Sequence, residues 1–257
     1  MFDKTLKVRA VQANPVPREV DANIRYVRDQ MNEAESDVVV FPELFISGYQ
    51  TERLEDVALS SGGTWCSDLA EVCAATTSGL VVGFVEQAEG EFFNSMLVID
   101  VDGTVRCPIR KTHLFGSERD VFIAGDDIAP VELCGASVGV LNCFELEFPE
   151  VARTLRLKGA DLFLAGSANM HPFADEHVVA TRGRVFENRI PLCYANRVGD
   201  ESGYEFCGGS CIIAANGNVL DQLDSSEVNS LVASVVLGSS AEPNMEMVSQ
   251  RRPELYC

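Results

Sequence analysis

The chain has 257 residues, of which 46% are hydrophobic and 23% charged, and its formal net charge at neutral pH is −19. This size and apolar content predict a large core in one α/β domain spanning residues 1–257. The acidic balance argues against nucleic-acid binding, which depends on Lys and Arg that release counterions from phosphates. Apolar runs such as SDVVVF are far shorter than the roughly 20 residues of a membrane span, and MFDKTLKVRA has no basic and apolar leader, so we expect a cytoplasmic protein without membrane contact.

The first half of the chain begins with a strand over 6–13. Apolar residues at helical spacing from Val20 to Ala34 then predict an amphipathic helix. The run DVVVF at 37–41 indicates a strand covered on both faces, and FPELFISGY continues it as a loop. Further strands are expected within 80–87 and 92–111, with Asp102-Gly103 at a hairpin turn.

The second half returns to alternating strands and helices. A strand at 137–143 precedes a helix that has Pro149 near its first turn and Gly159 after its last. The remaining predicted elements are strands at 161–167, 191–196 and 230–237, a helix at about 174–188, and a hairpin over 211–223 that turns at Asn216-Gly217. Alternation at both ends with hairpins in the middle favours two mixed sheets covered by helices.

Cofactor signatures are missing from the sequence. It contains no glycine-rich phosphate loop of the GxGxxG or GxxxxGKS type. Its nine cysteines form an odd set without a CxxC pair, and only three histidines accompany them, so a zinc site is not expected. We therefore expect reduced thiols, no metal and no organic cofactor.

Three reactive residues each follow a predicted strand: Glu43, Lys111 and Cys143. Taken singly, each has a structural reading, because strand-end glutamates are commonly solvated and lone cysteines commonly pack in cores. Cys143 also lies beside acidic residues, which disfavour a thiolate. Together, however, a thiol, a carboxylate base and an ammonium form a complete set for nucleophilic attack on a carbonyl.

Three segments, FPELFISGY, RKTHLFGSERDVFIAGDD and LNCFELEFPEVARTLRLKGAD, together resemble the carbon-nitrogen hydrolase (nitrilase) superfamily. The resemblance covers nearly the whole chain and keeps the motifs in the family's order. It implies a four-layer αββα sandwich, a homodimer or higher homo-oligomer, and a site that cleaves non-peptide C–N bonds of small molecules without a cofactor.

Carried over by position, the resemblance makes Glu43 the general base, Lys111 the site lysine and Cys143 the nucleophile. Glu118 matches a further site glutamate that helps to position the substrate. The implied course is attack of the thiolate on an amide carbonyl, departure of ammonia, and hydrolysis of the thioester by a water that Glu43 activates.

Residues near the motifs have a functional and a structural reading. Phe144 is expected to form a pocket wall, and Ser167, Ala168 and Asn169 match a loop that borders the substrate. Glu145 and Glu150 are assigned to the scaffold, through pairing with Arg182, Arg184 or Arg189 or through helix-start electrostatics. Glu147 either stabilises a helix start or binds a substrate ammonium group.

Within the family, the motifs most resemble the branch with 5-aminopentanamidase and (R)-stereoselective amidases, which favours a short aliphatic ω-amino amide. The Cys-Phe-Glu sequence differs both from the Cys-Tyr-Asp of many amidases and from the Cys-Trp-Glu of nitrilases. Hydrolysis of an N-carbamoyl compound or of a nitrile therefore stays open. A non-enzymatic paralogue is disfavoured because Glu43, Lys111 and Cys143 are all present.

Overall fold

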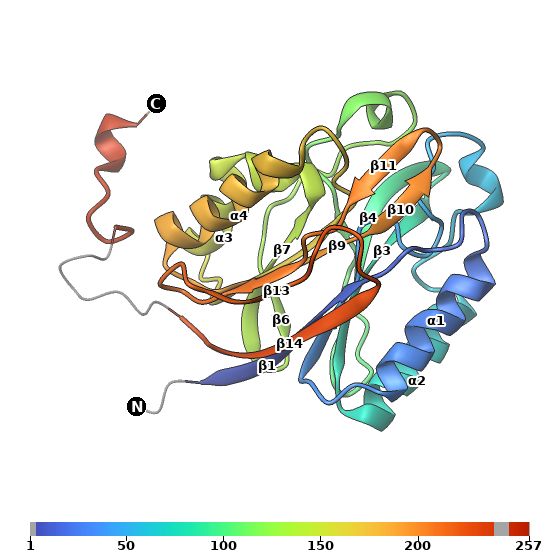
Figure 1. Ribbon diagram of the computed structural model, residues 1–257, viewed down its shortest axis with the longest axis horizontal. Helices are drawn as coiled ribbons and strands as arrows, with labels where there is room; N and C mark the ends of the chain where they lie inside the picture. The colour runs from blue at the N-terminus through green and yellow to red at the C-terminus, as the bar shows by residue number, and fades with distance from the viewer. Residues whose placement is uncertain (1–3, 239–246, 257) are drawn as a thin grey trace.

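Two six-stranded mixed β-sheets lie face to face at the centre of the protein, and a pair of helices covers the outer face of each sheet (Figure 1). The computed structural model describes residues 4–238 and 247–256. The αββα sandwich predicted from the sequence is confirmed by this arrangement.

The first sheet has the strand order β14-β1-β2-β3-β4-β5 and carries helices α1 and α2. Its central strand β2 pairs in parallel with β1 and with β3, and the remaining pairs are antiparallel. The elements of this half are β1 Thr5–Gln12, α1 Val20–Asn32, β2 Val38–Val40, α2 Thr64–Thr76, β3 Gly79–Ala88, β4 Glu91–Ile99, β5 Ile109–Arg110 and β14 Asn229–Val236.

The second sheet has the order β13-β12-β9-β8-β7-β6 and carries helices α3 and α4. Strand β8 pairs in parallel with β7 and β9. The elements of this half are β6 Val131–Leu133, β7 Ala136–Asn142, α3 Pro149–Leu157, β8 Leu162–Ser167, α4 Ala174–Asn188, β9 Leu192–Asn196, β12 Cys211–Ile213 and β13 Val219–Gln222. A separate hairpin joins β10 Val198–Glu201 to β11 Tyr204–Cys207, and short 3₁₀ helices are η1 Leu54–Asp56, η2 Gly116–Asp120, η3 Cys143–Glu147 and η5 Pro253–Leu255.

Strand β2 contributes to two layers of the core, one between the sheets and one between its sheet and the helices α1 and α2. Its neighbouring side chains point to opposite faces, as they must in a strand. Val38 and Val40 are fully buried between the two sheets, whereas Val39 is fully buried against the helices α1 and α2. An uninterrupted apolar run is therefore required at 38–40, as the sequence predicted.

The helix after β7 begins and ends where the sequence indicated. Pro149 occupies the first turn of α3, where its missing N–H costs no helical hydrogen bond. Gly159 follows the last turn with φ +101°, a conformation that side chains disfavour. The alternation of strand and helix on both sides of α3 fixes the parallel order of β7, β8 and β9.

Helix α2, strand β6, the β10–β11 hairpin and the short 3₁₀ helices were not predicted. The signals for two of them are present in the sequence. The buried residues of α2 recur at helical spacing, although Cys, Ala and Thr make them less distinct than the leucine and valine patterns elsewhere. The hairpin turns at Ser202-Gly203, where both residues have positive φ, as a type I′ turn requires.

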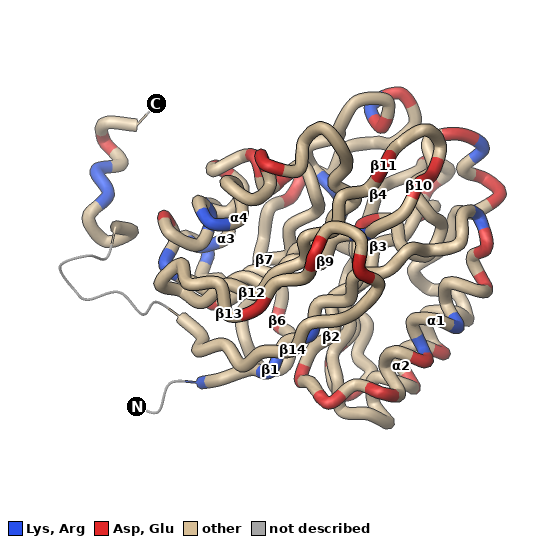
Figure 2. Tube along the Cα trace, in the orientation of Figure 1, with Lys and Arg blue, Asp and Glu red and all other residues tan. Residues whose placement is uncertain are grey.

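Charged side chains of both signs are distributed along both halves of the chain (Figure 2). The net charge of −19 is therefore not confined to one element. Within residues 4–238 and 247–256, no helix has the length and apolar character needed to cross a membrane.

Candidate active site

The predicted site residues come together where the two sheets meet. Glu43 lies in the loop after β2 and Lys111 follows β5, so both belong to the first sheet. Cys143 begins η3 directly after β7, and Ser167 ends β8, so both belong to the second sheet. Glu118 reaches the same place from η2. The carboxyl ends of parallel strands β2, β7 and β8 thus supply the site, as α/β folds commonly do.

The loop that carries Glu43 is held tightly against β3. Ile46 N–H donates to the Gly83 carbonyl at 3.0 Å, and Gly83 N–H donates to the Pro42 carbonyl at 3.2 Å. A Cβ at residue 83 would lie 2.2 Å from the Leu44 nitrogen, so only glycine allows this approach. The backbone around Glu43 is therefore fixed by main-chain contacts on both sides.

Lys111 lies between two buried carboxylates. Its Nζ is 2.6 Å from Glu43 Oε1 and 2.9 Å from Glu118 Oε2, and all three side chains are fully buried. One ammonium and two carboxylates leave a net charge of −1 at this position when all are ionised. Such a group is stable in a core only when hydrogen bonds satisfy the remaining oxygens.

Those hydrogen bonds are present. Glu43 accepts from Asn94 Nδ2 at 2.8 Å and from the Ala168 N–H at 3.2 Å. Glu118 accepts from the Tyr49 hydroxyl at 2.8 Å and from the Phe115 N–H at 3.0 Å. The two sheets contribute donors to the same carboxylate of Glu43, which keeps it aimed into the site.

Opposing effects act on the proton affinities of this group. Burial lowers the pKa of Lys111, but the negative charges of Glu118 and Glu43 outweigh burial and raise it above its ordinary value. Burial raises the pKa of Glu118, and Glu43 adds to that rise against the opposing charge of Lys111. Lys111 is therefore a permanent cation, whereas Glu118 binds a proton more readily than an exposed glutamate.

Cys143 occupies a constrained position at the end of β7. Its φ is +46°, a left-handed conformation that costs a non-glycine residue about 1–3 kcal/mol. The side chain is 8% exposed, and its Sγ accepts a hydrogen bond from Ser167 Oγ at 3.3 Å. Backbone strain of this kind is concentrated at functional sites. There it points a side chain in a direction that an unstrained backbone would not allow.

The surroundings of Cys143 favour the protonated form of its thiol. Burial raises the pKa of the Cys143 thiol well above its ordinary value, and the Glu43 carboxylate raises it further. Lys111 and the hydrogen bonds from Ser167 and the Ala168 N–H oppose this rise without cancelling it. A reaction at this sulfur consequently needs a base that removes the proton as attack occurs.

A small pocket opens beside Cys143, with a free volume of about 20 Å³. The predicted wall residue Phe144 lines it, and so do Ala168 and Asn169 from the predicted substrate loop. Ser167 instead lies against the sulfur. The other lining residues are Tyr49, Phe115, Glu118, Glu147, Met170, Phe173 and His177. Aromatic rings thus surround one face of the thiol.

Glu147 belongs to this pocket and also has a partner on α4. Its side chain is 34% exposed, and Oε1 lies 3.4 Å from His177 Nε2. No signal in the sequence indicated His177 as that partner. The position allows the substrate-binding role predicted for Glu147, which stays a prediction.

Glu145 does not pair with arginine as the first of its two structural readings expected. Its carboxylate accepts from Thr112 N–H and from Asn142 N–H, each at 2.8 Å, and from Thr112 Oγ1 at 2.6 Å. The bond to Asn142 caps the start of η3, which agrees with the helix-start reading. Glu145 therefore ties the Lys111 segment to the Cys143 segment.

Several buried polar residues of the site were not found from the sequence. Asn94 in β4 bonds to Glu43 and also accepts from Asn142 Nδ2 at 3.0 Å. Its signal is a polar residue within the apolar strand FFNSMLVI. Tyr49 closes the FPELFISGY motif, yet nothing local indicates that its hydroxyl reaches Glu118.

Among residues 4–238 and 247–256, no cluster of three or more His, Cys, Asp or Glu side chains has the geometry of a metal site. The chemistry available from the described side chains is that of a thiol, two carboxylates and an ammonium. These groups support nucleophilic attack, proton transfer and stabilisation of an oxyanion.

Comparison with known proteins gives concordant matches. A family model described as carbon-nitrogen hydrolase matches residues 7–242. A Pseudomonas protegens protein named "Hydrolase in pqqF 5'region" is 37% identical over 98% of this chain and 91% of its own length. An (R)-stereoselective amidase from Pseudomonas sp. is 34% identical over 77% of this chain and 73% of its own.

A solved structure of the amidase from Nesterenkonia sp. AN1 is similar over 98% of this chain and 95% of that chain, with a TM-score of 0.83 and 25% identity. That variant shows covalent addition of the acetamide moiety of fluoroacetamide at its active-site cysteine.

Proposed function

The chain belongs to the carbon-nitrogen hydrolase family, and we propose that it cleaves a small aliphatic amide to a carboxylate and ammonia through a thioester on Cys143. The observation that supports this most directly is the buried group of Glu43, Lys111 and Glu118 beside the Cys143 thiol. A cysteine nucleophile also agrees with the adduct on the active-site cysteine of the Nesterenkonia amidase.

In the first step, Glu43 acts as the general base. The raised pKa of Cys143 means that the thiol proton leaves only as the sulfur attacks the amide carbonyl. Glu43 is held in place by Asn94 and by the Ala168 N–H, so it needs no reorganisation to accept that proton.

Lys111 and the backbone N–H of Phe144 stabilise the oxyanion of the tetrahedral intermediate. Lys111 is suited to this because its raised pKa keeps it charged throughout the reaction. Glu118 contacts Lys111 and helps to orient the amide nitrogen. Glu43 then passes its proton to the departing ammonia.

Water completes the cycle. With ammonia gone, Glu43 is again a free base and activates a water molecule against the thioester carbonyl. Proton transfer to the Cys143 sulfur restores the resting thiol and releases the carboxylate. Overall, one amide and one water are consumed and the carboxylate and ammonia are formed, so no further reactant is needed.

The substrate that we propose is a short aliphatic ω-amino amide. The pocket beside Cys143 is narrow, and its aromatic walls suit methylene groups. Glu147 lines the same pocket and offers a carboxylate to a terminal ammonium group. This finer proposal accords with the 5-aminopentanamidase-like branch that the motifs resemble.

Ammonia release across five substrate classes tests the proposal. The set is ω-amino amides, dicarboxylic monoamides, simple aliphatic amides, N-carbamoyl compounds and nitriles. We expect the amides to give the highest kcat/KM, with the ω-amino amides first. Carbon dioxide released with ammonia from an N-carbamoyl compound, or preferred turnover of nitriles, would overturn the amidase assignment.

Glu147→Gln is expected to lower kcat/KM for an ω-amino amide by about 10- to 100-fold relative to a neutral amide of equal length. The basis is the loss of one charge-assisted hydrogen bond, which contributes about 1.5–3 kcal/mol. Glu150→Gln is the matched control, because Glu150 is an exposed acid in the first turn of α3. An unchanged ratio between the two substrates in Glu147→Gln would rule out the ammonium contact.

A homodimer or higher homo-oligomer is part of the proposal. The outer surfaces of α3 and α4 expose large apolar side chains, with Leu157 at 49%, Phe186 at 54% and Val179 at 72%. Contact with a second copy would remove this apolar area from water. Sedimentation velocity tests the assembly, and a monomer at micromolar concentration would contradict it.

A further inference from the structure

A chain of polar contacts leads from the Cys143 sulfur to Glu147, which lines the same pocket. Ser167 Oγ donates to Cys143 Sγ at 3.3 Å, and the Tyr194 hydroxyl donates to Ser167 Oγ at 3.2 Å. His177 Nδ1 lies within hydrogen-bond distance of the Tyr194 oxygen, at 3.0 Å, and His177 Nε2 lies 3.4 Å from Glu147 Oε1. Three side chains thus connect the thiol with a carboxylate that is partly exposed.

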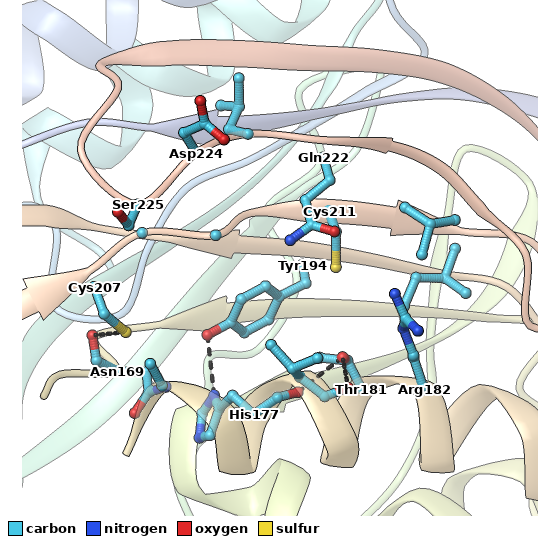
Figure 3. A pocket seen from close by; sticks show the side chains of 17 residues that line it. Asn169, His177, Thr181, Arg182, Tyr194, Cys207, Cys211, Gln222, Asp224 and Ser225 are labelled. Carbon is cyan, nitrogen blue, oxygen red and sulfur yellow. Dashed lines mark hydrogen bonds between the residues drawn. The ribbon is translucent and has the colours of Figure 1, made fainter. Parts of the chain in front are cut away.

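The inner members of this chain are buried and come from different elements. Ser167 of β8 is 0% exposed, and Tyr194 of β9 and His177 of α4 are each 3% exposed. Figure 3 shows the Tyr194 hydroxyl and the His177 ring pointing toward each other between the sheet and α4. They form one wall of a second cavity, of about 220 Å³, which shares His177 and Asn169 with the Cys143 pocket.

The direction of each hydrogen bond follows from what each group can donate. Ser167 Oγ accepts from the Asn169 N–H at 3.1 Å and from Tyr194, so its own proton is the one that points to sulfur. Tyr194 has a single proton, which goes to Ser167. Its oxygen must therefore accept from His177, which requires a proton on Nδ1.

The other nitrogen of His177, Nε2, faces the Glu147 carboxylate at 3.4 Å. This contact holds the ring from the side opposite Tyr194. The protons on His177 Nδ1, the Tyr194 hydroxyl and the Ser167 hydroxyl then all point toward Cys143.

We propose that His177 is a positioning residue that, held against Glu147, directs the hydroxyl protons of Tyr194 and Ser167 toward the Cys143 sulfur. The inference rests on the proposed function, in which that sulfur becomes a thiolate. Three consecutive donors ending at Sγ stabilise the developing negative charge on it.

The titratable groups that face His177 come from several elements. Glu147 and Tyr194 contact it directly. On its own helix, Asp175 and Glu176 occupy the first turn. The remaining titratable side chains that line the adjoining cavity are Arg182, Cys207, Cys211 and Asp224.

The same chain affects how Glu147→Gln is interpreted. That variant removes the partner of His177 as well as the proposed site for a substrate ammonium group. The first loss lowers turnover of neutral and amino amides alike, whereas the second lowers only that of amino amides. The ratio between the two substrates therefore isolates the substrate contact.

The test is kcat and KM for a neutral aliphatic amide in the wild-type protein and three variants. His177→Asn keeps an amide donor near the Nδ1 position. His177→Leu removes the donor, and Tyr194→Phe removes the hydroxyl that relays it. Circular dichroism and thermal unfolding establish that each variant is folded.

We expect His177→Leu and Tyr194→Phe to lower kcat about tenfold with little change in KM, which corresponds to the loss of one hydrogen bond. His177→Asn should retain more of the wild-type kcat than His177→Leu, because its amide can still donate to Tyr194. A folded Tyr194→Phe variant with the wild-type kcat, or equal kcat values in His177→Asn and His177→Leu, would overturn the inference.

Alkylation with iodoacetamide separates this inference from the proposed function. Peptide mass spectrometry follows Cys143, and the exposed thiol of Cys107 serves as the internal control. If modification of Cys143 leaves turnover intact, the proposed function fails. If modification abolishes turnover but His177→Asn and Tyr194→Phe behave as wild type, only the positioning role fails.

Discussion

Cys143→Ala is expected to abolish amide turnover and to eliminate the acyl-enzyme that mass spectrometry detects after rapid quenching. Removal of the nucleophile from a covalent catalytic set lowers kcat on the order of 10⁶-fold. Glu43, Lys111 and Glu118 remain in place in this variant, but without sulfur they have no covalent route to the product. Ammonia release measures the loss.

Cys107→Ala is the matched control, because Cys107 is the exposed cysteine among the described residues and lies outside the pocket. It should retain full activity. The fold of Cys143→Ala should be unchanged, since alanine removes one buried atom without introducing a polar group. Turnover within tenfold of wild type in a folded Cys143→Ala variant would contradict the thioester route.

Lys111→Met is expected to abolish activity and to lower the free energy of unfolding by about 3–5 kcal/mol. The variant leaves Glu43 and Glu118 buried near each other without the cation that both contact. Their mutual repulsion favours protonation, so the pKa of Glu118 should rise further. Urea unfolding at pH 5 and pH 8 measures the change.

The pH dependence of this loss has a definite sign. A carboxyl whose pKa is raised by folding keeps its proton in the folded protein at pH values where it is ionised in the unfolded chain. The free energy of unfolding therefore falls as pH rises toward the folded-state pKa. The deficit of Lys111→Met should therefore be larger at pH 8 than at pH 5. Lys7→Met, at an exposed position of β1, should show neither a deficit of this size nor the trend.

A second substitution provides an internal check on Lys111→Met. Glu118→Gln added to it removes one of the two like charges, and the double variant should be more stable than Lys111→Met alone. Activity should stay absent in both. Equal or lower stability of the double variant would mean that charge repulsion is not the cause of the deficit.

The sequence predicted the elements whose apolar patterns are continuous, and it failed where packing depends on distant partners. Strand β2 and helix α3 could be placed because valines at 38–40 and the Pro149 and Gly159 punctuation are local signals. Helix α2 and the β10–β11 hairpin were missed although each carries a local signal, because Cys, Ala, Thr and Ser-Gly are common in loops as well.

The residues of the candidate site also divide into those that the sequence indicates and those that it does not. Glu43, Lys111, Glu118 and Cys143 could be predicted because each lies in a recognisable motif, and the structure brings all four to one place. The supporting residues Tyr49 and Asn94 could not be predicted, because their partners are distant in the sequence. The contact of Tyr49 with Glu118 spans 69 positions, and that of Asn94 with Asn142 spans 48. Their partners are determined by how the two sheets face each other.

The opposed sheets have a thermodynamic consequence for the reaction. Glu43 is contributed by one sheet, yet the Ala168 N–H that fixes its second oxygen comes from the other, as does the Cys143 sulfur. Neither half of the sandwich alone brings Glu43, the Ala168 N–H and the Cys143 sulfur together. A fluctuation that separates the two sheets would therefore abolish the proposed activity before either half has unfolded.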